Sequence, residues 1–271
     1  MVEPTPPEPG TDQVPAQRLP RVDLVIPVLN EAHVLEKSVQ AVRAFLAEHG
    51  PWAWRVVVVD NGSTDGTDAV AKRLEAAHPD TVQFIQLPQR GRGRALRHAW
   101  TQSDADVMGY TDVDLSTELA ALPKLVRALL EEGYDLGTAS RLLPESKTVR
   151  SFKREAISRV YNLIVKAVLG TSFSDAQCGF KVISHRVAQE IVPEIVDQSW
   201  FFDTELLVLA EKRGYRIKDL PAEWTEDDDS RVKIAKTAWE DLKGIARVRW
   251  KLWREALSPT TRPAVAMSKR V

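Results

Sequence analysis

Two aspartates separated by one residue point more directly to chemistry than any other part of this sequence. Asp112 and Asp114, in YTDVDLS, directly follow the apolar run 107–110. At the end of a strand, side chains two residues apart point the same way, so both carboxylates can face one divalent cation. Such a cation keeps other coordination positions open for phosphate oxygens and water. Acidic pairs are also common at solvated turns, so this pair needs support from the rest of the chain.

A glycine-punctuated basic loop offers a site for an anion. Arg92 and Arg94 lie in GRGRAL, at the start of a predicted helix. Backbone N–H groups, the positive end of the helix dipole and a guanidinium together suit a phosphate. A solvated basic loop is the alternative explanation of the same charge pattern.

A second basic group lies later in the chain. Arg141 follows the predicted strand 136–140, and Arg154 and Ser158 are four residues apart in a predicted helix. Residues at i and i+4 share one face of a helix, so Arg154 and Ser158 can both reach a single anion. The alternative is ordinary basic decoration of a helix surface, which neighbouring Lys and Arg residues show is present here.

The elements that must position these residues alternate between strand and helix. Apolar β-branched runs predict strands, and apolar residues at helical spacing predict helices. Strands are predicted at 22–27, 54–60, 81–87, 107–111, 136–140, 180–184 and 217–222, the last as an edge strand, and helices within 28–49 and at 68–77, 94–103, 122–132, 153–169, 188–192 and 204–213. Asp203 is the expected N-cap of the last helix, and Gly214 follows its end. This alternation predicts the α/β class, with an open, mostly parallel twisted sheet covered by helices on both faces.

The polar motifs fall where such a sheet binds ligands. Open α/β sheets bind at the carboxyl ends of their strands, and Asn30–Glu31, Asp60–Asn61, Gln89–Arg94 and Asp112–Asp114 all follow predicted strands. The segment NGSTDG after Asp60 is also typical of a tight turn that caps a helix, and this role is compatible with binding.

Taken in order, the motifs VIPVLNE, VVVVDNGSTDGT, GRGRAL, TDVDLS, ASR and DAQCGFK resemble the family-two inverting glycosyltransferases with the GT-A nucleotide-diphospho-sugar fold. Within them, the chain is most similar to the polyprenyl-phosphate branch, which contains dolichyl-phosphate mannose synthases and dolichyl-phosphate β-glucosyltransferases. The resemblance covers about residues 21–242. Ser116 stands where mannose synthases tend to carry Gln, which favours the glucosyltransferase side.

The resemblance implies a role for each group of residues. Pro27, Asn30 and Glu31 would line the nucleotide pocket with Asp60 and with Asn61, which replaces a second aspartate usual in the family. Mg²⁺ or Mn²⁺ on Asp112 and Asp114 would neutralise the departing diphosphate. Further implied residues are Arg92 and Arg94, which would bind a phosphate, and Arg141, Arg154 and Ser158, which would hold the lipid phosphate.

The resemblance therefore implies inverting transfer of a hexose from UDP-glucose or GDP-mannose to a polyprenyl or dolichyl phosphate. A phosphate monoester is largely dianionic at neutral pH, so it needs no catalytic base. One alternative is transfer to a hydroxyl of a soluble or glycan acceptor, with Asp203 or Glu205 as the base. Another is a non-catalytic nucleotide-sugar-binding protein at a membrane surface. The pair Asp112 and Asp114 argues against the latter, because two carboxylates repel each other without a metal.

The composition limits the partners and the compartment. The 37 basic and 38 acidic residues nearly cancel, which disfavours nucleic-acid binding through bulk charge. The single cysteine, Cys178, rules out an internal disulfide, fits a reducing compartment and is expected to be a packed small residue. The predicted domains are a disordered Pro-rich arm at 1–20, a catalytic domain at 21–232, an amphipathic helix at 233–257 and a flexible tail at 258–271.

The amphipathic helix decides how the chain would meet a lipid acceptor. Trp239, Trp250 and Trp253 lie near one side at helical spacing, among many Lys and Arg residues. This pattern fits the headgroup region of a membrane, although a helix packed on the domain explains it equally well. No apolar run is long enough to span a bilayer and no signal peptide is evident. We therefore expect a peripheral protein on the cytoplasmic face of the membrane, docked directly or through a membrane-protein partner.

Overall fold

The computed structural model describes residues 18–225 and 234–257. Its strands are β1 (Arg21–Val28), β2 (Ala53–Asn61), β3 (Val82–Leu87), β4 (Val107–Thr111), β5 (Leu136–Ser140), β6 (Lys147–Val149), β7 (Phe180–Ser184), β8 (Ile217–Pro221) and β9 (Glu223–Thr225). Seven of them form one sheet in the order β3-β2-β1-β4-β7-β5-β8. All neighbours in it are parallel except β7, which is antiparallel to β4 and to β5. The predicted mostly parallel sheet and its edge strand β8 are therefore confirmed.

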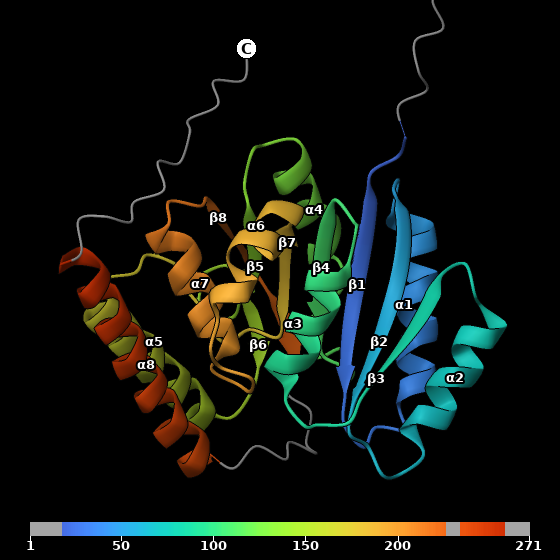
Figure 1. Cartoon of the computed structure of the whole chain (residues 1–271), viewed down its shortest axis with the longest axis horizontal. Helices are drawn as coiled ribbons and strands as arrows, with labels where there is room; N and C mark the ends of the chain where they lie inside the picture. Colours follow the sequence, from blue (N-terminus) through green and yellow to red (C-terminus); the bar gives the residue numbers. More distant parts are fainter. Residues whose placement is uncertain (1–17, 226–233, 258–271) are drawn as a thin grey trace, which may run out of the picture.

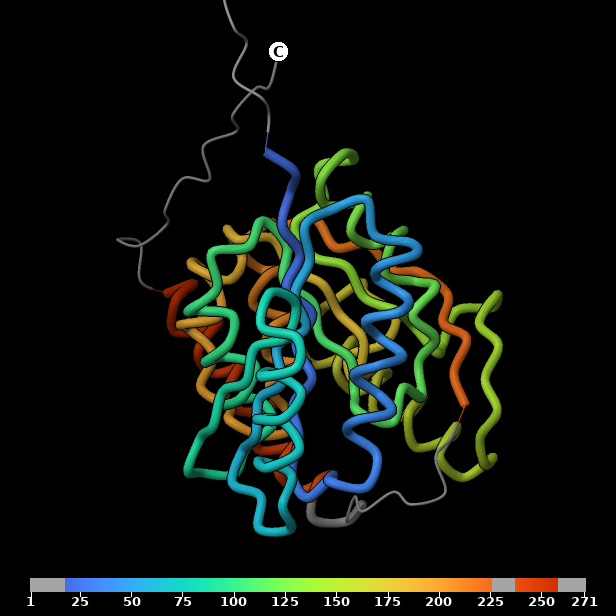
Figure 2. Tube along the Cα trace, turned by 90° about the vertical axis from the view of Figure 1, so that its right-hand side faces the viewer, coloured from blue at the N-terminus to red at the C-terminus, as the bar shows by residue number. Residues whose placement is uncertain are grey.

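Helices cover both faces of this sheet (Figure 1). They are α1 (Leu35–His49), α2 (Thr67–Ala77), α3 (Arg92–Gln102), α4 (Ala121–Leu130), α5 (Phe152–Leu169), α6 (His185–Glu190), α7 (Phe202–Lys212) and α8 (Ile234–Leu257). One core holds buried residues of α1, α2 and α4, and a second holds those of α3, α5, α6, α7 and α8. The middle strands are buried on both faces, as their continuous Val and Ile content predicts. Figure 2 shows α1 and α2 side by side on their face of the sheet.

The antiparallel strand β7 decides which motifs meet. Thr111, the last residue of β4, pairs with Phe180, the first residue of β7. The carboxyl end of β4 and the amino end of β7 therefore lie together, which places Asp112 beside Gly179. The same reversal brings the segment DAQCGFK to the carboxyl end of β5, where Arg141 follows. The reversed strand thus joins two motifs that are far apart in the sequence.

Several details differ from the sequence predictions. Asp203 lies inside α7, whose N-cap is Phe201, while Gly214 has the left-handed φ of 83° expected after a helix end. The helix predicted at 188–192 begins earlier as α6 and is followed by a 3₁₀ turn at Val192–Glu194. The short strands β6 and β9, which form a second sheet, escaped prediction because three residues carry too little periodicity. The predicted arm and tail lie outside the described residues, apart from residues 18–20.

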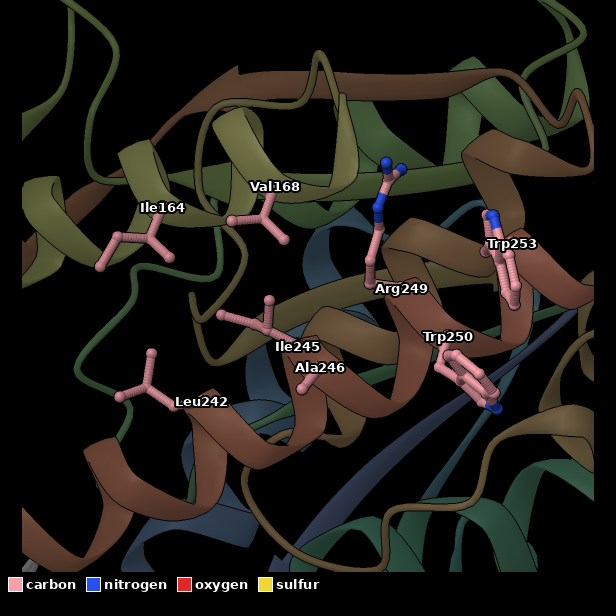
Figure 3. A pocket seen from close by; sticks show the side chains of 8 residues that line it. All are labelled: Ile164, Val168, Leu242, Ile245, Ala246, Arg249, Trp250 and Trp253. Atoms are coloured by element: carbon pink, nitrogen blue, oxygen red, sulfur yellow. The ribbon is translucent and has the colours of Figure 1, made fainter.

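Helices α5 and α8 pack against each other at one side of the molecule (Figure 1). The inner face of α8 is buried in the core through Ile245 and Val248. Gly244 allows close approach to the domain, because a Cβ there would lie 2.4 Å from the Phe201 ring. Between the two helices runs an apolar groove (Figure 3), lined by Ile164, Val168, Leu242, Ile245, Ala246, Arg249, Trp250 and Trp253. Among the described residues, no helix is both long enough and apolar enough to cross a membrane.

Candidate active site

The two aspartates lie in a tight turn directly after β4. The Leu115 N–H donates to the Asp112 carbonyl oxygen at 3.1 Å, and Leu115 has a left-handed φ of 53°. The chain therefore turns after Thr111, and Asp112 and Asp114 are not held in the extended geometry that the prediction assumed. They remain close enough that the negative charge of Asp114 contributes to raising the pKa of Asp112, after the larger effect of burial. Asp114 is exposed, and its Oδ1 accepts from the Ser116 N–H at 3.0 Å.

Arg92, the first residue of α3, neutralises Asp112. Its Nε and Nη2 donate to Asp112 Oδ1 at 3.2 and 2.9 Å, and its guanidinium carbon lies 4.8 Å from the centre of the Tyr110 ring and 5.1 Å from that of Trp200. The other carboxylate oxygen faces Gly179, where a Cβ would lie only 1.8 Å from Oδ2. Glycine at this position therefore leaves the space that the Asp112 carboxylate occupies.

A buried ion-pair network lies behind Arg92. Arg92 Nη1 donates to Asp203, which is 1% exposed. Asp203 Oδ1 lies 2.5 Å from the Tyr110 hydroxyl and 3.2 Å from the Nζ of the fully buried Lys181. Burial raises the pKa of Asp203, but the positive charges of Lys181 and Arg92 outweigh it, so this pKa lies below its usual value. A carboxylate held in this way is a weak proton acceptor.

Glu205, the other carboxylate considered as a base, is also held by an arginine. It is 1% exposed, and Arg247 of α8 donates to its Oε2 at 2.7 Å. Its Oε2 also accepts from the Asp197 N–H at 3.0 Å. Both candidate bases thus serve buried contacts that hold α7 to its neighbours.

At the end of β2, Asn61 is hydrogen-bonded to neighbouring segments, whereas one carboxylate oxygen of Asp60 lacks a hydrogen-bond partner among the described residues. Asn61 Nδ2 donates to the Val28 carbonyl oxygen at 2.7 Å, and its Oδ1 accepts from the Gly91 N–H at 3.2 Å. Asn61 therefore ties the ends of β1 and β2 to the basic loop. Asp60 is fully buried, and its Oδ1 accepts from the Ser63 N–H at 3.0 Å. Its buried Oδ2 has no hydrogen-bond partner within the part of the chain that the structure describes.

The other predicted nucleotide-pocket residues surround the same turn. Pro27 lies in β1, and the Glu31 N–H donates to Thr67 Oγ1 at 2.9 Å. Asn30 has a left-handed φ of 60°, and its Oδ1 accepts from the Thr64 N–H at 2.8 Å. Beside this turn is an open hollow lined by Gly62, Ser63, Thr64, Gln86, Leu87 and Pro88.

The two arginines of the basic loop have different environments. Arg92 turns inward to Asp112, whereas the Arg94 side chain donates to Gln89 Oε1. The Arg94 N–H donates to the Gln198 carbonyl oxygen at 3.1 Å. The structure thus brings Arg92 to the aspartate pair, whereas Arg94, in the first turn of α3, contacts Gln89 and Gln198 instead.

Arg141 is fixed at the end of β5 by a two-point ion pair. Its Nε and Nη2 donate to Asp175 Oδ2 and Oδ1 at 2.7 and 3.0 Å, and Asp175 is fully buried. Burial raises the pKa of Asp175, but Arg141 outweighs it and lowers this pKa to about 2. In the same loop, burial raises the pKa of the Cys178 thiol to about 11, which fits a packed residue rather than a nucleophile.

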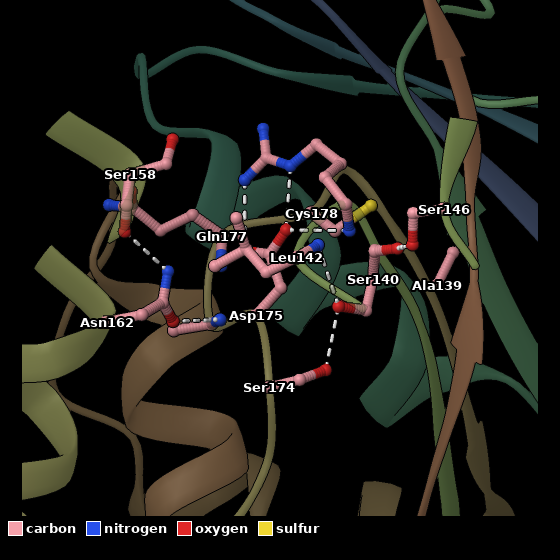
Figure 4. Close-up of polar contacts among 12 residues, drawn as sticks. Ala139, Ser140, Leu142, Ser146, Ser158, Asn162, Ser174, Asp175, Gln177 and Cys178 are labelled. Atoms are coloured by element: carbon pink, nitrogen blue, oxygen red, sulfur yellow. Dashed lines mark hydrogen bonds and ion pairs between the residues drawn. The ribbon is translucent and has the colours of Figure 1, made fainter. Parts of the chain in front are cut away.

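The middle of α5 lies beside the loop that holds Asp175 and Gln177. Figure 4 shows Ser158 and Asn162 of α5 next to this loop; Asn162 Oδ1 accepts from the Ala176 N–H at 2.8 Å. Ser158 Oγ accepts from Arg150 Nη1 at 3.3 Å. Arg154 lies one helical turn before Ser158. Arg150 and Asn162 were not predicted to contact this region, because nothing in the local pattern separates them from ordinary polar residues in or next to a helix.

A comparison with protein families shows which family the chain belongs to. The family described as "Glycosyl transferase family 2" matches residues 23–192, more than half of the chain. This chain belongs to glycosyltransferase family 2.

Curated relatives of this glycosyltransferase are similar over most of the chain. It is 34% identical over 233 residues to glycosyltransferase AglD of Haloferax volcanii, covering 85% of this chain and 37% of that protein. It is 27% identical over 221 residues to dolichyl-phosphate beta-glucosyltransferase ALG5C of Trichomonas vaginalis, covering 78% of this chain and 66% of that protein. The Saccharomyces cerevisiae dolichyl-phosphate beta-glucosyltransferase is 26% identical over 246 residues, with 84% and 74% covered. The chain thus spans little more than a third of the first relative and about two thirds of the second.

Solved structures place the fold among GT-A glycosyltransferases. Glucosyl-3-phosphoglycerate synthase of Mycobacterium tuberculosis superposes with a TM-score of 0.61 at 18% identity, covering 85% of this chain and 80% of that one. A Pyrobaculum calidifontis mannosyltransferase, in complex with GDP-Man and Mn²⁺, superposes with a TM-score of 0.52 at 20% identity, covering 81% and 60%. The GT-A fold expected from the motifs is therefore confirmed.

Proposed function

We propose that this family 2 member transfers a hexose, with inversion, from a nucleotide-diphosphate sugar to a polyprenyl phosphate. The observation that carries the proposal is the contrast between the two sides of the site. Asp203 and Glu205, the carboxylates that could activate a hydroxyl, are held by basic residues. Arg141 follows β5 and is held by Asp175, whose loop contacts α5, the helix that carries Arg154 and Ser158. An acceptor that carries its own negative charge fits this arrangement, because a phosphate needs positive groups and no base.

A divalent cation fits the aspartate pair. Among the described residues, no three His, Cys, Asp or Glu side chains gather as a metal site, so Asp112 and Asp114 would supply two ligands and the diphosphate and water the others. Mg²⁺ is commonly bound in this way, by one or two carboxylates and substrate phosphates. Such a cation would neutralise the charge of the departing diphosphate. The Mn²⁺ and Mg²⁺ complexes of the Mycobacterium tuberculosis synthase support the assignment.

The donor would lie over the ends of β1 and β2. The unsatisfied Asp60 Oδ2 offers a buried acceptor for a hydroxyl or N–H group of the nucleoside. Asn61 is engaged by backbone groups on both sides, so it shapes the pocket rather than reading the base. The glucosyltransferase relatives, together with Ser116, favour UDP-glucose over GDP-mannose.

Acceptor and donor would react without a base in this proposal. The ion pair with Asp175 holds the Arg141 guanidinium in one orientation, which positions the acceptor phosphate at low entropic cost. Arg154 and Ser158 would bind the same phosphate from α5. Arg92 lies against Asp112 and would place positive charge beside the diphosphate.

The exposed faces of α5 and α8 would meet the membrane that holds the acceptor. Val160 and Leu163 on α5 are 56% and 67% exposed, and Trp239 and Trp250 on α8 are 60% and 59% exposed. α8 therefore packs on the domain with one face and presents tryptophans with the other, so its packing is compatible with the proposed membrane contact. Indole rings and nearby basic side chains suit a headgroup interface. We place this face on the cytoplasmic leaflet.

A direct assay tests the proposal. The chain is incubated with Mg²⁺ or Mn²⁺, with UDP-glucose or GDP-mannose, and with a polyprenyl phosphate, and the lipid is analysed by mass spectrometry. We expect one hexose on the lipid phosphate, and at least about a hundredfold less with Asp112→Asn or Asp114→Asn, the scale of a lost electrostatic stabiliser. Asp80→Asn, at an exposed position before β3, is the matched control. Transfer to a free alcohol but not to the phosphate would contradict the proposal.

A further inference from the structure

The helix α8 contacts the loop that holds the acceptor side of the site. Asp241 of α8 is only 3% exposed, and its Oδ2 accepts from Gln177 Nε2 at 2.8 Å. The Gln177 N–H donates to Asp175 Oδ1 at 3.0 Å, and Arg141 Nη2 donates to that same oxygen at 3.0 Å. Three hydrogen bonds thus lead from α8 to the arginine assigned to the acceptor phosphate.

The contact costs stability, which argues for a role beyond packing. Asp241 Oδ1 is buried without a hydrogen-bond partner among the described residues. A buried carboxylate with one unsatisfied oxygen is less favourable than an apolar side chain at the same position. The helix already has other contacts with the domain, through Gly244 on Phe201 and through Arg247 on Glu205. Asp241 is therefore not needed simply to attach α8.

The loop that Asp241 contacts is short and held at both sides. The Ala176 N–H, next to Gln177, donates to Asn162 of α5 at 2.8 Å. A shift of α8 relative to α5 would therefore pull directly on residues 175–177, and with them on the Arg141 guanidinium. The two helices that carry the exposed apolar face are thus also the two that hold this loop.

We propose that Asp241 and Gln177 are positioning residues for Arg141, through which the seating of α8 sets the acceptor-phosphate site. The inference rests on the proposed function and deepens it. It predicts that breaking the Asp241–Gln177 hydrogen bond weakens acceptor binding and leaves donor binding unchanged, because the donor lies at the ends of other strands.

Kinetics of the full chain test the link. Asp241→Ala and Gln177→Ala should each raise KM for polyprenyl phosphate about three- to tenfold, the effect of one lost hydrogen bond, with KM for the nucleotide sugar unchanged. Asp241→Asn, which still offers an acceptor oxygen to Gln177, should stay within about twofold of the unmodified chain. The double variant Asp241→Ala/Gln177→Ala should be no worse than either single variant, because both remove the same contact. Glu240→Ala, an exposed neighbour on α8, is the control and should leave both KM values unchanged.

Hydrogen exchange gives a second readout that does not depend on turnover. The backbone N–H of Gln177 should exchange faster in Asp241→Ala and keep its protection in Asp241→Asn. Equal changes of donor and acceptor KM, additive effects in the double variant, or unchanged exchange at Gln177 would overturn the link. If the unmodified chain transfers no sugar to polyprenyl phosphate, the proposed function fails and the inference falls with it. If the unmodified chain does transfer sugar to polyprenyl phosphate but the variants behave like it, only the positioning role fails.

Discussion

At the scale of single residues, charge is balanced inside the site before any ligand arrives. Arg92 neutralises Asp112, and Lys181 and Arg92 together neutralise Asp203. Since a buried charge without a partner is strongly unfavourable, these contacts make a dense charged site compatible with a stable fold. They also separate the roles of the carboxylates, because Asp112 and Asp114 keep solvent access whereas Asp203 is buried.

Gly179 provides a sharp test at this scale. Its φ is not in the left-handed region, so alanine is compatible with the backbone, but its Cβ would meet Asp112 Oδ2 at 1.8 Å. We expect Gly179→Ala to displace the Asp112 carboxylate and to lower turnover at least about tenfold, while raising the metal concentration needed for half-maximal rate. Metal titration of the rate measures both. The double variant with Asp112→Asn should be no slower than Asp112→Asn alone; a further large loss would show that Gly179 acts elsewhere.

At the scale of elements, the sheet and α5 separate the residues that we propose for the donor from those that we propose for the acceptor. The former follow β1, β2 and β4, while the latter follow β5 or lie on α5. The reversed strand β7 lies between β4 and β5 and brings its loop to both. Changes on α5 should therefore affect one substrate only.

Arg154→Ala tests this division. We expect a higher KM for polyprenyl phosphate, about tenfold or more, because a charge-assisted contact to a phosphate is lost. The affinity for UDP or GDP with Mg²⁺, measured by calorimetric titration, should stay within about twofold. Arg159→Ala on the same helix is the control, because Arg159 is exposed and pairs with Glu155. Weaker nucleotide binding by Arg154→Ala would instead assign this arginine to the donor.

The outer face of α8 has its own test. Deleting the helix would expose the core around Ile245 and Val248, so substitution of outer residues is cleaner. The triple variant of Trp239, Trp250 and Trp253 to Ala should fold normally, because these side chains are about half exposed or more, yet lose most binding to anionic vesicles. Cosedimentation measures the bound fraction, and high salt should weaken binding of the unmodified chain. Leu19→Ala, exposed before β1, should bind normally; unchanged binding by the triple variant would place the membrane contact elsewhere.

At the scale of the whole molecule, two buried carboxylates give opposite pH dependences of stability. Burial raises the pKa of Asp241 to about 6, while its hydrogen bond with Gln177 opposes the shift and the negative charge of Asp197 adds to it. The phenol of Tyr161 on α5 also interacts with Asp241, and Arg247 on α8 lies 3.8 Å from Asp197. Because this folded-state pKa exceeds the ordinary 3.8, Asp241 favours folding most below pH 4. That contribution is lost as the pH rises from about 4 to 6. For Asp175, whose pKa is about 2, stability is instead lost as the pH falls from about 4 to 2.

Asp241→Asn should therefore stabilise the protein at neutral pH. The gap between 3.8 and about 6 corresponds to roughly 3 kcal/mol at 1.36 kcal/mol for each tenfold change. We expect the variant to gain up to that amount in free energy of unfolding at pH 7.5, and the gain to shrink as the pH falls from 6 to 4. Urea unfolding at a series of pH values measures it. A difference between variant and unmodified chain that does not change over this range would contradict the raised pKa.

Much of this protein follows from local sequence. The apolar runs and the helical spacing predicted the strands of the main sheet and the long helices, because period and β-branching act over a few residues. Strand ends follow from strand positions, so the sequence also placed Asp60, Asp112 and Arg141 at one edge of the sheet. The order of the motifs was enough to identify the family.

The tertiary structure alone decided how these residues are used. Contacts such as Arg92 with Asp203 and Asp241 with Gln177 join positions 111 and 64 residues apart. They exist because β7 is reversed between β4 and β5 and because α8 returns to pack on α5. No local period encodes either event, since strand direction and helix docking depend on the free energy of the assembled core. The chain thus determined by itself which chemistry is present, while the fold determined which carboxylates are neutralised and which remain open to a ligand.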